Sequence, residues 1–99
     1  MTIEKKQDGR CLTVAVGGRL DTTTAPQLDD ALQGLDSVEA LTLDFGELAY
    51  VSSAGLRVLL STQKKMNQLG GKMVVRNVCE DIMDVFDLTG FSDILTIEA

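Results

Sequence analysis

Two adjacent serines, Ser52 and Ser53, stand where an apolar, strand-like run ends and helical spacing begins, in the stretch AYVSSAGLRVLL. A serine hydroxyl can accept a hydrogen bond, act as a nucleophile or receive a phosphate. Three interpretations therefore compete at this junction: a helix cap, a catalytic residue or a modification site. Taken by itself, the position favours a cap, because serine at the start of a helix commonly accepts a hydrogen bond from an early backbone N–H group.

The composition argues against catalysis by these serines. The chain has no histidine, which removes Ser-His and Cys-His catalysis and the usual zinc ligand sets. A nucleophile elbow needs glycine two residues before the serine, where this chain has Val51. Neither Gly17-Gly18 nor Gly70-Gly71 leads into the Gly-Lys-Ser/Thr of a phosphate-binding loop. We therefore expect that the protein is not an enzyme and that it uses no metal and no cofactor. An enzyme that hydrolyses a nucleotide is the weakest alternative.

Phosphorylation fits the physical setting of Ser53 better than catalysis does. A phosphate at a helix N-terminus faces free backbone N–H groups and the positive end of the helix dipole. Arg57 follows four residues later, about one helical turn away, and could reach the same oxygens. The added charge of about −1.5 to −2 would change the surface presented to a partner without unfolding the helix. Such a change makes a binary switch.

The net charge and the hydropathy of the chain narrow the choice of binding partners and of cellular compartment. The formal net charge of −6 argues against a nucleic-acid surface, which needs clustered Lys and Arg, and it leaves the oligomeric state open. No run approaches the roughly 20 apolar residues of a membrane span. No apolar run follows the charged N-terminus, so we expect no signal peptide and a cytoplasmic protein. Cys11 and Cys79 are far apart in sequence and are expected to be reduced thiols.

The spacing of apolar residues predicts strands that alternate with helices. Leu12 and Val14 alternate with polar neighbours as in a strand, and the turn at Asp8-Gly9 would pair the first strand antiparallel to it. The remaining alternation favours parallel pairing through right-handed crossovers. We expect one small α/β domain over residues 1–99, with a mixed, mostly parallel sheet of about four to five strands and about three to four helices. The expected strands are 2–7, 11–20, 38–45, 72–77 and 91–99, and the expected helices are 24–35, 53–69 and 78–89.

Capping patterns predict where the helices begin. Thr24 with Gln27 has the spacing of a capping box at the start of the first helix. Asn77 with Glu80 has the same spacing before the third helix. Glycines at the expected helix ends, among them Gly90, predict the stops.

Four blocks of the chain stand out in order along the sequence: GRLDTTTAPQL, ALTLDFGELAYVSSAGLRVLL, GGKMVVRNV and VFDLTGFSDILTI. They resemble the successive blocks of a STAS domain and, more narrowly, of the stand-alone bacterial anti-sigma-factor antagonists. The resemblance covers nearly the whole chain, and the central block is quite specific.

This resemblance implies a function by partner switching. In that family, the unphosphorylated antagonist binds an anti-sigma factor, which is also a serine kinase of the GHKL type, and so frees the sigma factor. Phosphorylation of a serine at the start of the second helix releases the antagonist, and a PP2C-type phosphatase restores it. Aligned through Gly55 and Leu56, the modified serine falls on Ser53. Catalysis would then belong to the partners.

The chain departs from the family motif at one position. The family usually has Asp-Ser-Ser/Thr-Gly-Leu, and here Ser52 stands in place of the Asp, which makes Ser52 a rival target. The resemblance also implies a partner-binding surface around the modified serine, carried by the loop before the first helix and by the start of the second helix. Its expected residues are Asp21, Thr22, Thr23, Thr24, Ser52, Ser53, Ala54, Gly55 and Arg57.

A second interpretation uses the same fold without a switch. STAS domains also serve as adaptor subunits of transporters or lipid-export ATPases, where the serines would be unmodified contacts. In either case Asp21 and the threonines can have a purely structural role, because such side chains often bond turn amides or cap helices.

Overall fold

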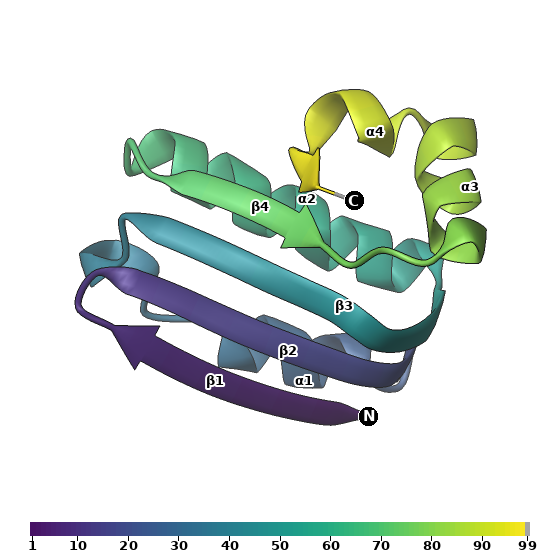
Figure 1. Ribbon diagram of the computed structural model, residues 1–99, viewed down its shortest axis with the longest axis horizontal. Coiled ribbons are helices and arrows are strands. Elements are labelled where there is room, and N and C mark those ends of the chain that lie inside the picture. Colours follow the sequence, from purple (N-terminus) through teal and green to yellow (C-terminus); the bar gives the residue numbers. More distant parts are fainter. Residues whose placement is uncertain (99) are drawn as a thin grey trace.

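The computed structural model describes residues 1–98, which form a five-stranded sheet in the order β1-β2-β3-β4-β5. Helices α1 and α2 lie on one side of the sheet, behind it in Figure 1, and α3 and α4 lie together beyond β4. The elements are β1 Thr2–Asp8, β2 Cys11–Leu20, α1 Ala25–Ala31, a 3-10 turn Leu35–Ser37, β3 Ala40–Val51, α2 Ser53–Gln68, β4 Lys72–Arg76, α3 Glu80–Thr89, α4 Phe91–Ile94 and β5 Ile97–Glu98.

The pairing of the strands confirms the predicted mixed, mostly parallel sheet. β1 pairs antiparallel to β2 through the turn that follows Asp8, where Gly9 adopts a φ of 62°. β2, β3, β4 and β5 are all parallel to one another. Parallel neighbours need crossovers, which α1, α2 and the α3–α4 pair supply.

The core lies between the sheet and the helices. Alternate residues of β2 and β3, such as Val14 and Leu43, are completely buried, and they pack with Leu28 of α1 and Leu59 of α2 in the same apolar cluster. The other face of the sheet carries small or polar residues such as Thr13, which remains exposed. The period of two in the strands is therefore the signature of a sheet that is covered on one side.

Both predicted capping pairs are wrong, because each side chain bonds to another partner, a local one for Thr24 and a distant one for Asn77. Thr24 is the N-cap residue of α1, but its hydroxyl makes no cap bond and is turned back toward the loop before the helix. Asn77 has a left-handed φ of 59°, and its amide donates to Asp44 at 3.0 Å. The residue at the N-cap of α3 is instead Cys79, which makes no side-chain cap bond.

Two predicted elements are much shorter in the structure, and the third strand is longer, since it runs to Val51 and not to residue 45. The first helix stops at Ala31, and the chain then forms a separate 3-10 turn over Leu35–Ser37, which still buries Leu35. The last segment begins with the helical turn α4, so only Ile97–Glu98 pairs with β4 as a strand. The predicted glycine stop after the third helix is confirmed, since Gly90 has a φ of 81°.

The first turn of α2 lies very close to the ends of β2 and β3. Gly55 is buried, and a Cβ atom there would lie 2.6 Å from Cγ of Leu20 and 3.0 Å from Cγ2 of Val51. Real Cβ atoms do not come this close to other carbons, so only glycine fits without a shift of the helix.

We predict that Gly55→Ala destabilises the protein, although the same change in an ordinary helix stabilises it by about 1 kcal/mol. The added methyl group must displace Leu20 or the helix, which costs about 1–3 kcal/mol. Urea denaturation measures the effect, with Ser61→Ala on the exposed side of the same helix as control. A stabilised Gly55→Ala protein would contradict this packing.

Candidate functional site

The two serines have different structural roles at the turn between β3 and α2. Ser52 is the N-cap residue, with φ −101° and ψ 175°, and its Oγ accepts a hydrogen bond from the N–H of Gly55 at 3.5 Å. Its own backbone N–H donates to the carbonyl of Leu20 at 2.8 Å. Ser53 is the first residue of the helix, and it is exposed. The cap predicted from the sequence therefore belongs to Ser52.

Ser53 lies at a shallow hollow between α2 and the α3–α4 pair. The hollow is lined by Ser53 and Arg57, by Leu56 and Leu60 of α2, and by Thr89 and Phe91. The structure thus places Arg57 beside Ser53, as the spacing along the helix predicts. Among residues 1–98, no carboxylate lies within ion-pair distance of the Arg57 guanidinium. Sequence reasoning missed Thr89 and Phe91 because they lie more than thirty positions away along the chain, with no local signal.

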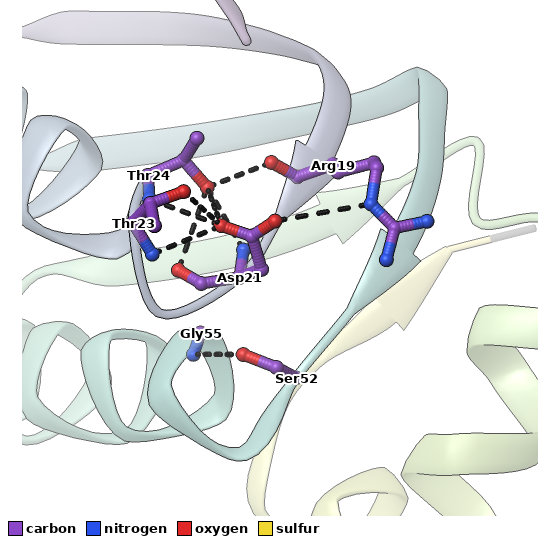
Figure 2. Close-up of polar contacts among 6 residues, drawn as sticks. All are labelled: Arg19, Asp21, Thr23, Thr24, Ser52 and Gly55. Atoms are coloured by element: carbon purple, nitrogen blue, oxygen red, sulfur yellow. Dashed lines mark hydrogen bonds and ion pairs between the residues drawn. The ribbon is translucent and has the colours of Figure 1, made fainter.

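The loop between β2 and α1 is ordered around the carboxylate of Asp21 (Figure 2). One of its oxygens, Oδ1, accepts from the hydroxyl of Thr23 at 2.7 Å, from the amide of Thr23 at 3.0 Å and from the amide of Thr24 at 3.2 Å. The hydroxyl of Thr24 donates to the carbonyl of Arg19 at 2.7 Å and accepts from the amide of Asp21 at 2.8 Å. The loop is therefore closed by side-chain bonds of the kind that turns use.

These bonds also change the acidity of Asp21. The hydrogen bond from the Thr23 hydroxyl, together with those from the amides of Thr23 and Thr24, lowers the pKa of Asp21 below its ordinary value, against the opposing effect of desolvation. Hydrogen bonds to the charged form favour that form. Asp21 is thus held as a carboxylate by its own loop.

Arg19 links this loop to the end of β3. Its guanidinium lies 4.2 Å from the centroid of the Tyr50 ring, and its Nε lies 3.8 Å from Oδ2 of Asp21. Arg19 and Tyr50 are direct neighbours in the parallel register of β2 and β3. A cation over an aromatic ring is attracted by the ring quadrupole, so the pair connects the loop with the strand that leads to Ser52. Neither residue is among the site residues predicted from the sequence.

The structure brings the loop and the start of α2 to one surface. Thr22 and Pro26 on one side, and Ala54 and Arg57 on the other, line a groove between α1 and α2. Of the residues expected to bind a partner, only Gly55 is fully buried, so its contribution is packing. The others are exposed or half-buried around this groove and the Ser53 turn.

Neither a metal-binding cluster nor a membrane-spanning helix is found among residues 1–98. Within residues 1–98, no three His, Cys, Asp or Glu side chains are grouped so that they could hold a metal ion. No described helix has both the length and the apolar character needed to cross a bilayer. Cys11 and Cys79 are both free and exposed.

Comparison with known proteins identifies the family. The model of the STAS domain matches residues 2–99, and the chain therefore belongs to the STAS domain family. An anti-sigma-B factor antagonist of Bacillus subtilis is 31% identical to it over 100 residues, which cover 100% of this chain and 92% of that protein.

Solved structures show the same fold. The crystal structure of an anti-sigma factor antagonist from Mycobacterium paratuberculosis is similar with a TM-score of 0.85 and 26% identity, covering 97% of this chain and 83% of the other. The Bacillus cell fate determinant SpoIIAA, solved in its phosphorylated form, is similar with a TM-score of 0.78, covering 99% of this chain and 92% of the other. Its 15% identity shows a shared fold alone.

We predict opposite effects for two substitutions of Ser52. Ser52→Ala removes the acceptor for the Gly55 N–H and lowers the free energy of unfolding by about 0.5–1 kcal/mol. Ser52→Asp places a carboxylate at the positive end of the α2 dipole and raises it by about 0.3–1 kcal/mol. Urea denaturation checks both. Ser53→Ala is the matched control, and a cost as large as that of Ser52→Ala would contradict the assignment of Ser52 as the cap.

We predict that Thr23→Val raises the pKa of Asp21 toward its ordinary value, because the hydroxyl that donates to Oδ1 is lost. Since the folded-state pKa lies below the unfolded value, near 3.8, the stabilisation from Asp21 is present above about pH 4 and is lost as the pH falls through the folded pKa. Carboxyl chemical shifts followed by NMR against pH measure the change. Thr22→Val is the control, and an equal shift in that variant would refute the assignment to Thr23.

Proposed function

We propose that this protein is an anti-sigma-factor antagonist that acts by partner switching, with Ser53 as the phosphate acceptor. The unphosphorylated protein binds an anti-sigma factor that is also a serine kinase, and phosphorylation of Ser53 causes the complex to dissociate. The named relatives in Bacillus and Mycobacterium support the antagonist role. A structural neighbour solved in a phosphorylated form is consistent with a switch on this fold.

The different positions of the two serines carry the proposal. The Oγ of Ser52 is engaged by the N–H of Gly55, and the backbone of Ser52 is tied to Leu20. Ser53 is exposed at the first position of α2. A kinase must align the acceptor oxygen with the transferred phosphoryl group, and an exposed hydroxyl that is not used as a cap meets this need more easily.

Phosphorylation would change the surface without disturbing the fold. The phosphate would sit at the N-terminus of a 16-residue helix, where the dipole favours an anion. It would lie beside the guanidinium of Arg57, which has no ion-pair partner among residues 1–98. It would also sit at the mouth of a hollow lined by Leu56, Leu60 and Phe91. A dianion at an apolar contact must be desolvated when a partner covers it, so a complex that buries this region loses affinity.

The chemistry then belongs to the partners. A GHKL-type kinase supplies the phosphoryl group and a PP2C-type phosphatase removes it, while this chain supplies an acceptor and a binding surface in the cytoplasm. The groove lined by Thr22, Ala54 and Arg57 adjoins the acceptor and is part of that surface. Asp21 and Thr23 keep the loop in shape beside it.

The test is the intact mass, with mapping of the modified residue, of the protein isolated from its native host under several growth and stress conditions. We expect a species heavier by about 80 Da, the mass of one phosphoryl group, in the wild type and in Ser52→Ala. We expect none in Ser53→Ala. The two alanine variants differ by one position and are therefore matched controls for each other.

Two other outcomes would change the conclusion. A phosphate mapped to Ser52 would reject Ser53 as the acceptor and keep the switch. A wild-type protein that is never modified would favour the adaptor role, in which the chain is a subunit of a transporter or lipid-export ATPase complex and the serines are plain contacts.

A further inference from the structure

The outer edge of β1 is long and unpaired in the described structure. β1 runs for seven residues, pairs with β2 on one side, and has no described element on its other side (Figure 1). The opposite edge of the sheet, β5, has only the two residues Ile97 and Glu98. Short edges are protected from pairing with other strands, whereas a long regular edge presents a row of free N–H and C=O groups.

The hairpin determines which residues of β1 present these groups. Asp8 and Cys11 flank a two-residue turn, and residues in that position form a hydrogen-bonded pair. Bonding toward β2 then alternates along the strand, so the backbone groups of Ile3, Lys5 and Gln7 point to the open edge. This edge contains no proline and no bulge in its pairing with β2.

The charges of β1 are complementary to those of a second copy in one register. In an antiparallel pair of two β1 strands centred on Lys5, Glu4 of each copy lies opposite Lys6 of the other, and Ile3 lies opposite Gln7. Directly opposed residues share a face of the sheet, so both Glu4–Lys6 pairs form on the uncovered face. Two attractive pairs then oppose one Lys5–Lys5 contact on the other face.

The neighbouring registers lack this match. Centring the pair on Glu4 places two carboxylates opposite each other, and centring it on Lys6 places two ammonium groups opposite each other and Glu4 opposite Asp8. Lysine on an edge strand usually discourages pairing, but here Glu4 and Lys6 lie two residues apart on one face, so that a second copy in one register matches both charges. Glu4 also lines a hollow with Asp44 and Glu47, which places its carboxylate on the uncovered face of the sheet.

We propose that β1 is a self-association edge, at which two copies of this chain pair antiparallel about Lys5 and join their five-stranded sheets into one. The two-fold axis is perpendicular to the sheet, so the helices of both copies lie on the same side. The contact uses none of the residues of the Ser53 surface. It therefore stands or fails independently of the proposed function.

Sedimentation equilibrium of the whole chain between about 10 μM and 1 mM tests this proposal. We expect a weak, salt-sensitive dimer, since exposed ion pairs are screened. Lys6→Glu should raise the dissociation constant by roughly tenfold or more, because each of the two pairs becomes repulsive. Glu4→Lys combined with Lys6→Glu should restore it to within about threefold of the wild type, because both pairs are reversed. Lys64→Glu on exposed α2 makes the same charge change away from the edge and should have no effect.

A backbone test complements the charge swap. Lys5→Pro removes the N–H that points to the open edge while leaving the pairing with β2, and it should give a monomer with an unchanged circular dichroism spectrum. A wild type that is monomeric throughout the range would overturn the proposal. So would a dimer that is indifferent to Lys6→Glu or to Lys5→Pro, or one that the double charge swap does not restore.

Discussion

The approach of the first turn of α2 to the ends of β2 and β3 is the constraint on which the site depends. Gly55 lies against Leu20 and Val51, with no room for a side chain, and the N–H of Ser52 is bonded to the carbonyl of Leu20. Together these contacts determine the residue at which the helix begins. If the helix began one residue later, Ser53 would become the cap and its hydroxyl would be engaged. The exposure of Ser53 is thus a consequence of core packing.

The loop around Asp21 depends on the same end of the sheet. Its carboxylate is used internally, by Thr23 and by the backbone amides, and Arg19 braces it against Tyr50. Because the carboxylate of Asp21 is occupied in this way, its main role is to order the loop, and it is less available to a partner as a charged group. The surface beside Ser53 consequently combines a rigid backbone with small exposed side chains, which suits recognition by shape.

The two faces of the sheet have different roles. Helices cover one face, so the apolar residues of β2 and β3 form a single core, and the ends of these strands present the Ser53 turn. The other face and the outer edge of β1 carry charged and small residues that need no cover for stability. A parallel sheet is ordinarily covered by helices on both faces. Here the uncovered face is polar enough to contact water, so it needs no second layer of helices.

The sequence by itself determined the alternation of strands and helices, the hairpin at Asp8 and the presence of two serines at a helix start, because these follow from local periodicity and turn chemistry. It did not determine which serine caps the helix, since that depends on the contact of Gly55 with Leu20. It also misassigned Thr24 and Asn77, whose side chains have the local propensity of caps. The hydroxyl of Thr24 bonds back to Arg19 and Asp21 in its own loop, and the amide of Asn77 bonds to Asp44 on a neighbouring strand. Tertiary structure decided every feature that joins distant residues, because such contacts depend on register and packing, which local spacing does not encode.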